Sequence, residues 1–218
     1  MVEIKFCGVT RAADARVAAE LGADYVGVVF AGGPRRQDAA SASTIFAALP
    51  ASVQRVGVFG ADALTQTAEQ AKRLGLSVIQ LHGDPAADQV AALREQWPGK
   101  IWASVRVVGA ELPRPAAELF AVADAVLLEA KVEGALGGTG VALDWRAVAD
   151  AVASLRRGDH ARLVLAGGLK PENVAEAVRV LRPDVVDVSS GIEARVGIKD
   201  PARMRAFRDA VRSGEDAR

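Results

Sequence analysis

The sequence predicts a single-domain (β/α)8 barrel, the TIM-barrel architecture, from three observations. Short runs rich in β-branched residues alternate with longer Ala- and Leu-rich amphipathic stretches, and eight such pairs follow one another. No strand-rich interlude or linker interrupts them, which favours a closed parallel barrel over an open sheet. The length of 218 residues lies near the lower end for one barrel domain.

The strands are predicted from short apolar runs, which are typical of parallel strands that are buried on both faces. In chain order the eight runs are Val2–Val9, Asp24–Phe30, Val53–Phe59, Ser77–His82, Lys100–Val107, Ala125–Glu129, Arg162–Ala166 and Val185–Ser189.

The helices are predicted from amphipathic spacing and from residues that end or begin a helix. Gly22 and Gly75 follow helical patterns, and Gly75 is a plausible C-cap, whereas Pro85 lies near a helix start. The predicted helices are Ala12–Leu21, 39–49, Ala61–Leu74, Ala86–Trp97, Pro115–Val122, 145–155, Pro171–Leu181 and Pro201–Arg212.

Composition narrows the class of protein. Lys and Arg together equal Asp and Glu at 27 each, so no overall field favours nucleic acid or an anionic membrane. One cysteine allows no internal disulfide, and His82 and His160 form no metal-ligand spacing with it. No signal peptide or membrane span is recognised. We expect a cytoplasmic barrel over residues 1–212 with a polar tail over 213–218, and no metal.

The first strand carries the lone cysteine. Alternation places Glu3, Lys5 and Cys7 on one face, and the apolar residues Ile4 and Phe6 on the other. The outer strand face must be apolar against the helices, so Cys7 points into the barrel near its catalytic mouth. A free cysteine is equally often a small buried hydrophobic residue.

Two carboxylates end late strands. Glu129 ends the sixth strand, where the alternative is a solvated loop residue. Asp187 points inward from the eighth strand by the same alternation. An unpaired buried carboxylate is costly, so a polar mouth or a partner such as Lys5 is expected.

Glycine-rich loops follow the last three strands. They contain Gly138 and Gly140, then Gly167 and Gly168, and then Ser189, Ser190 and Gly191. Glycine lets the backbone approach an anion closely, and the loops after strands seven and eight often bind phosphate in this fold.

The rim also carries a basic pair and a histidine. Arg35 and Arg36 follow the second strand and are suited to bind a planar carboxylate, although a solvated surface pair is an equal reading. His82 ends the fourth strand and either contacts substrate or caps a turn.

Several motifs occur in a fixed order along nearly the whole chain. They are Lys5-Phe6-Cys7-Gly8-Val9-Thr10, Gln80-Leu81-His82-Gly83, Gly137-Gly138-Thr139-Gly140 with Asp144-Trp145, Ala166-Gly167-Gly168-Leu169 with Pro171-Glu172-Asn173-Val174, and Asp187-Val188-Ser189-Ser190-Gly191-Ile192-Glu193.

Together these motifs resemble the phosphoribosylanthranilate isomerase family of tryptophan biosynthesis. The resemblance implies a cofactor-free Amadori rearrangement of N-(5-phosphoribosyl)anthranilate to 1-(2-carboxyphenylamino)-1-deoxyribulose 5-phosphate. It assigns the general base to Cys7 and the general acid to Glu129. It also implies a small phosphorylated substrate and a monomer or homodimer.

Two departures from the family pattern are visible. Leu127-Leu128-Glu129 stands where the family more often has Leu-Leu-Asp. In the second loop, pairing the Pro-Arg dipeptides makes Arg35 the anthranilate-carboxylate ligand, whereas an ungapped match makes it Arg36. The alternatives to this family are another phosphosugar isomerase barrel, such as that of the histidine pathway, and a non-catalytic protein that binds a phosphoribosyl ligand.

Overall fold

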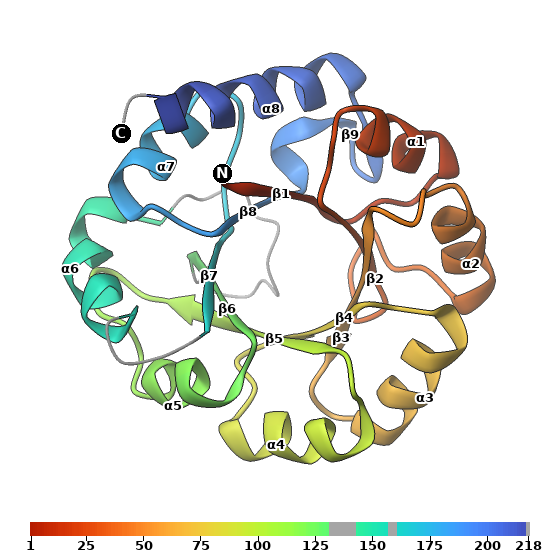
Figure 1. Ribbon diagram of the computed structural model, residues 1–218, viewed down its shortest axis with the longest axis horizontal. Helices are drawn as coiled ribbons and strands as arrows, with labels where there is room; N and C mark the ends of the chain where they lie inside the picture. Colours follow the sequence, from red (N-terminus) through yellow and green to blue (C-terminus); the bar gives the residue numbers. More distant parts are fainter. Residues whose placement is uncertain (131–142, 157–160, 217–218) are drawn as a thin grey trace.

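The computed structural model describes residues 1–130, 143–156 and 161–216. Within these ranges eight parallel strands pair in sequence order, and β8 pairs back with β1 to close a barrel. The helices form a ring around the strands (Figure 1). The predicted (β/α)8 barrel is confirmed.

The elements alternate along the chain. The barrel strands are β1 Glu3–Phe6, β2 Tyr25–Val29, β3 Gln54–Gly60, β4 Val78–His82, β5 Lys100–Val107, β6 Ala125–Ala130, β7 Arg162–Leu165 and β8 Val185–Val188. The helices are α1 Ala12–Glu20, α2 Ala39–Ala47, α3 Leu64–Leu74, α4 Ala87–Gln96, α5 Pro115–Val122, α6 Trp145–Arg156, α7 Val174–Leu181 and α8 Pro201–Asp216. Between β8 and α8 lie a 3-10 turn, η1 Ser190–Ile192, and an antiparallel hairpin of β9 Glu193–Arg195 and β10 Ile198–Lys199.

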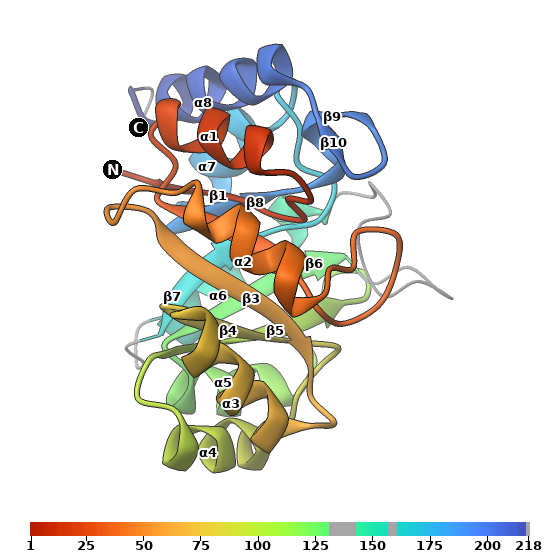
Figure 2. The same cartoon turned by 90° about the vertical axis from the view of Figure 1, so that its right-hand side faces the viewer.

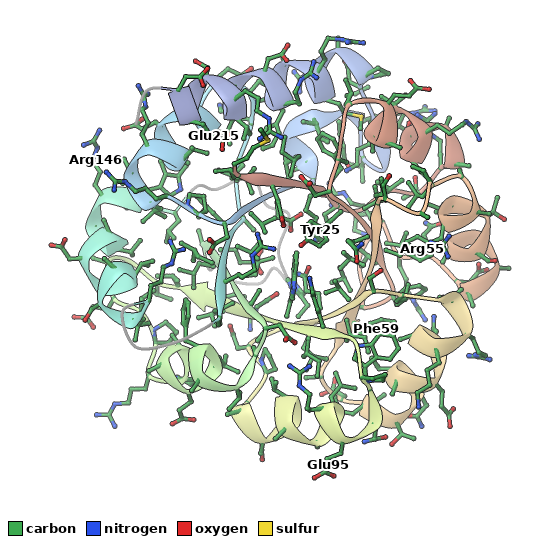
Figure 3. The ribbon with its side chains drawn as sticks, in the orientation of Figure 1. Tyr25, Arg55, Phe59, Glu95, Arg146 and Glu215 are labelled. Carbon is green, nitrogen blue, oxygen red and sulfur yellow. The ribbon has the colours of Figure 1, made fainter. Side chains whose placement is uncertain are left out.

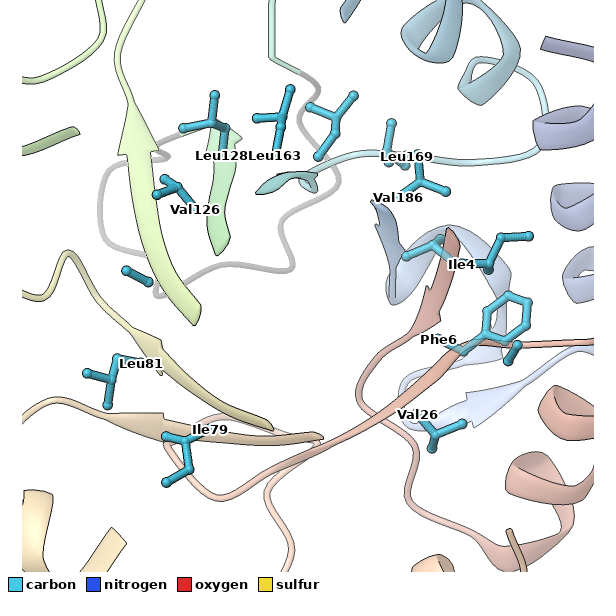
Figure 4. Close-up of a cluster of buried hydrophobic side chains, with 14 of the residues drawn as sticks. Ile4, Phe6, Val26, Ile79, Leu81, Val126, Leu128, Leu163, Leu169 and Val186 are labelled. Atoms are coloured by element: carbon cyan, nitrogen blue, oxygen red, sulfur yellow. The ribbon is translucent and has the colours of Figure 1, made fainter. Parts of the chain in front are cut away.

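The outer faces of the strands carry the main hydrophobic core. Ile4 and Phe6 are fully buried there, and the Phe6 ring lies 6.3 Å from that of Phe207 in α8. Figure 4 shows these side chains on the helix side of the strands, as the alternation predicted. Lys5 therefore points into the barrel.

A second, smaller apolar cluster fills the barrel interior. Tyr25 points into this space (Figure 3), and its ring meets Trp102 edge-on at 4.8 Å. Nearer the start of the strands, the Tyr25 hydroxyl and Arg162 both donate to the Glu3 carboxylate, at 2.8 and 2.7 Å. In the part of the chain that the structure describes, this cluster forms a packed floor inside the barrel.

Some element boundaries differ from those that the sequence predicts. β1 ends at Phe6, and α7 begins at Val174 because residues 170–173 form a turn in which Asn173 accepts from the Lys170 backbone N–H at 2.8 Å. α8 continues past Arg212 to Asp216, since Glu215 accepts from Arg212 and from the Val2 backbone. Residues 213–216, expected in a polar tail, are thus helical.

The two ends of the barrel differ. Figure 2 shows both termini at one end and the β9–β10 hairpin at the other. No helix in the described ranges is long and apolar enough to cross a membrane.

Candidate active site

A cavity of about 350 Å³ lies at the carboxyl ends of the strands. It gathers predicted site residues from strands and loops that are far apart in the sequence. Those lining it are Cys7, Arg35, His82, Glu129, Gly167, Gly168, Asp187, Ser189 and Ser190.

One wall of the cavity holds the thiol and a buried ion pair. Lys5 Nζ donates to Asp187 Oδ1 at 3.0 Å, and Lys5 is fully buried. This is the partner that the sequence suggested for Asp187. A Cβ on Gly27 would lie 3.0 Å from the Cys7 sulfur and 3.2 Å from Lys5 Nζ, so the missing side chain makes room for both.

The protonation of Cys7 differs from the simple expectation that a neighbouring lysine favours a thiolate. Burial raises the pKa of the Cys7 thiol, and the Asp187 charge raises it further. Lys5 lowers this pKa but does not cancel the other effects. Asp187 pairs with Lys5, and the net direction of the Cys7 pKa shift is upward, which favours the thiol.

Glu129, at the carboxyl end of β6, lines the same cavity and is 6% exposed. Burial raises the pKa of this carboxyl group, although the nearby His82 and Arg106 pull it down. His82 Nδ1 lies 3.5 Å from Glu129 Oε1. Gly167 packs on Glu129, where a Cβ would approach the Glu129 Cβ to 3.1 Å. A buried carboxyl group with a raised pKa suits a proton donor.

The loops after β7 and β8 form the rim. Gly167 and Gly168 both have positive φ, which glycine adopts at little cost. The Gly168 carbonyl accepts from Asn173 Nδ2 at 2.9 Å, and the Ser189 carbonyl accepts from Lys199 Nζ at 3.0 Å. Both loops are therefore held in shape by side chains.

Gly191, also expected at the phosphate site, lies at a tight contact between two loops. A Cβ there would lie only 2.0 Å from the Leu169 carbonyl oxygen, so glycine lets the β7 and β8 loops touch. Gly138 and Gly140, also expected at a phosphate site, lie outside the described residues.

The two arginines after β2, Arg35 and Arg36, lie in different surroundings. Arg35 lines the cavity, whereas Arg36 is exposed. Arg35 Nε and Nη2 donate to the two oxygens of Glu193 in β9, each at 2.7 Å. Glu193 also accepts from Lys199 of β10 at 3.0 Å.

Comparison with known proteins places the chain in a family. Residues 4–210 match the sequence model of N-(5'-phosphoribosyl)anthranilate (PRA) isomerase. The chain belongs to this family. It is therefore an isomerase.

Relatives that match over nearly the whole chain carry the name of the same family. The enzyme of that name from Pseudomonas fluorescens strain Pf0-1 is 42% identical over 97% of this chain and 98% of its own. The one from Acidithiobacillus ferrooxidans is 41% identical over 97% and 98%.

Solved structures of phosphoribosylanthranilate isomerases share the barrel. The Thermotoga maritima structure has a TM-score of 0.86 at 32% identity, and the Thermus thermophilus structure has 0.84 at 32%. Each match covers 97% of this chain and 99% of the other. Another structure, at 0.83 and 32% with the same coverage, is a complex with reduced 1-(o-carboxyphenylamino)-1-deoxyribulose 5-phosphate.

Three residues of the site were not singled out from the sequence. Gln80 lines the cavity, and its Nε2 donates to Ser104 at 3.1 Å. Strand alternation could have found Gln80, because it faces inward two positions before His82. Glu193 and Lys199 could not be found so, since their partner Arg35 is distant in the sequence.

Proposed function

We propose that the protein catalyses the Amadori rearrangement of N-(5'-phosphoribosyl)anthranilate in tryptophan biosynthesis, with Cys7 as general base and Glu129 as general acid. The carrying observation is that this thiol and this buried carboxyl group line one cavity in a chain of the isomerase family. The reaction is an internal redox isomerisation, so it requires no external oxidant or reductant. We further propose that the enzyme works in the cytoplasm as a monomer or homodimer.

Glu129 would act first. Its raised pKa keeps the carboxyl group protonated to a higher pH than usual. It donates this proton to the ribose ring oxygen, the C1′–O bond breaks, and the nitrogen lone pair forms a protonated Schiff base. Near neutrality each unit of pKa elevation multiplies the protonated fraction about tenfold.

Cys7 would act second. The Schiff base is cationic, and a cation beside the thiol favours the thiolate and so offsets the burial that raises the Cys7 pKa. The thiol first loses its own proton to solvent, the thiolate then removes the C2′ proton, and the C–H electrons neutralise the iminium to give an enolamine. Tautomerisation of the enolamine then yields the ketone.

The remaining residues would bind the two anionic ends of the substrate. Gly167, Gly168, Ser189 and Ser190 supply the rim for the phosphate, where glycine allows close backbone approach. We assign the anthranilate carboxylate to Arg35, because Arg35 lines the cavity and Arg36 is exposed.

His82 and Asp187 also line this cavity and complete the proposed substrate contacts. His82 lies beside the acid, and Asp187 lies beside the base, so each can contact the ribose chain between the two.

The test is to measure the turnover of the Cys7→Ser and Glu129→Gln variants. Turnover is monitored by the loss of substrate fluorescence. Removal of a general acid or base costs about 10²- to 10⁴-fold, so we expect losses of that order in kcat for each variant. Glu129→Asp, which keeps a carboxyl group, serves as the matched control. Near-normal turnover in both Cys7→Ser and Glu129→Gln would contradict the roles, and substrate affinity without turnover in the unsubstituted protein would support a binding protein instead.

A further inference from the structure

A cation stands next to the proposed acid. Arg106 of β5 is the register partner of Glu129 in β6, and register partners of parallel strands point to the same side. Trp102 lies in the barrel interior, and Ser104 bonds to Gln80 at the cavity wall. Alternation therefore puts Arg106 on the inner face, level with Glu129.

Asp84, in the turn after β4, holds this cation. Arg106 Nε donates to Asp84 Oδ2 at 2.8 Å, and Nη2 lies 2.6 Å from the same oxygen. The Arg106 backbone N–H donates to Asp84 Oδ1 at 2.7 Å. The side chain of Arg106 is 18% exposed and that of Asp84 is 39% exposed, so solvent partly screens this ion pair. The three contacts with Asp84 act as a clamp that fixes where the guanidinium lies.

Among the described residues, charged or titratable groups on several elements act on Glu129. Burial is the largest effect and raises the Glu129 pKa. His82 of β4 and Arg106 of β5 lower the pKa, whereas Asp187 of β8 and Asp84 raise it. An unclamped Arg106 would be free to approach Glu129, and a guanidinium and a carboxylate pair in a bidentate manner.

We propose that Asp84 is a positioning residue that keeps the Arg106 guanidinium off the Glu129 carboxyl group, so that Glu129 remains a proton donor. The inference rests on the proposed role of Glu129 as general acid. A guanidinium that pairs directly with a carboxyl group lowers its pKa by about 1 to 3 units. Each unit removes about nine-tenths of the protonated acid at pH values above the pKa.

Asp84→Asn tests the clamp with little change of shape. Asp84 has a φ of 58°, in the left-handed region, which asparagine also tolerates. We expect kcat at neutral pH to fall at least about tenfold, and the pH limb that reports Glu129 to move down by about one unit or more.

The second substitution Arg106→Met separates positioning from structure. In the double variant Asp84→Asn/Arg106→Met the cation is gone, so we expect kcat and the pH limb to return to near the unsubstituted values. The proposal would be overturned if the double variant were as impaired as Asp84→Asn alone. It would also be overturned if Asp84→Asn lost kcat while the limb of the pH–rate profile that reports Glu129 stayed in place.

A direct titration of Glu129 distinguishes this inference from the proposed function. The side-chain carboxyl ¹³C signal, assigned by its loss in Glu129→Gln, is followed with pH in the unsubstituted protein and in Asp84→Asn. We expect a lower midpoint in Asp84→Asn and restoration in the double variant. An unmoved midpoint would overturn the role of Asp84 and leave the proposed acid intact. A lowered midpoint with unchanged kcat would support the clamp but contradict Glu129 as the acid.

Discussion

Gly27 of β2 shows how closely the residues around the thiol are fitted. A Cβ there would lie 3.0 Å from the Cys7 sulfur and 3.1 Å from Lys5 Cε. Both neighbours are buried, so neither can move freely into solvent. The room for the proposed base and its lysine is thus made by a residue without a side chain.

We expect Gly27→Ala to lower kcat by about 10²-fold, because a misplacement on the order of 1 Å can cost that much. Overpacking should also cost about 1 to 3 kcal/mol of stability. Steady-state kinetics and urea unfolding measure the two effects. Gly60→Ala is the matched control, since the nearest atom to a Cβ there is the Asp62 carboxylate at 3.8 Å. Equal kcat values in the two variants would contradict the prediction.

Alternation along single strands predicted much of the site at the scale of the residue. It placed Lys5 and Asp187 inside the barrel, and the structure pairs them at 3.0 Å. The direction of the Cys7 pKa shift could not be predicted, because it depends on how burial, Asp187 and Lys5 balance. That balance is a property of packing in three dimensions.

The β9–β10 hairpin is the element that joins the second and eighth loops. Glu193 lies between Arg35 and Lys199, and the Lys199 side chain is fully buried. Burial tends to raise the Glu193 pKa, but Arg35 and Lys199 outweigh it and the pKa lies below its usual range. Burial also holds the Lys199 pKa below its usual range, despite Glu193.

We expect Glu193→Gln to destabilise the fold by about 3 kcal/mol at pH 7, since it leaves a buried lysine without its counter-charge. A carboxylate with a lowered folded-state pKa stabilises the fold above its unfolded pKa of about 4.3, and this contribution is lost as the pH falls through the folded-state value. The difference between the two proteins should therefore shrink as the pH falls below about 4.3.

Urea unfolding at pH 7 and at successively lower pH measures this effect, and Glu172→Gln, at an exposed position, is the control. A constant difference across the pH range would mean that the carboxylate charge is not what stabilises the hairpin.

The hairpin itself was not visible in the sequence. The stretch from Ser190 to Lys199 offers no apolar alternation that predicts paired strands, and β9 and β10 are only three and two residues long. They are held by Glu193, Lys199 and their partners, which are tertiary contacts. The eight barrel strands were predictable because burial leaves a short, mostly apolar and β-branched run in most of them, and a regular alternation in β1.

The barrel architecture of the whole molecule was predictable for a related reason. A chain that alternates strands and amphipathic helices can bury its helices only against a parallel sheet, and eight repeats are enough to close one. The floor of the barrel was less predictable, because its members come one or two at a time from different strands. The inner cluster consists of Tyr25, Val56, Val78, Trp102, Ala125, Leu127, Val164, Ala166 and Val185.

Trp102 is the largest side chain of this floor, and it is 1% exposed. Because neighbouring strands share the cluster, a cavity at Trp102 should weaken the entire barrel instead of one element. We expect Trp102→Ala to cost about 3 to 5 kcal/mol, with one cooperative transition and an unchanged urea m-value. Trp145→Ala, at a partly buried position on α6, should cost less. Urea unfolding, monitored by both circular dichroism and fluorescence, tests this prediction. A biphasic unfolding curve would contradict the prediction that the inner cluster makes the strands unfold together. So would a smaller loss of unfolding free energy for Trp102→Ala than for Trp145→Ala.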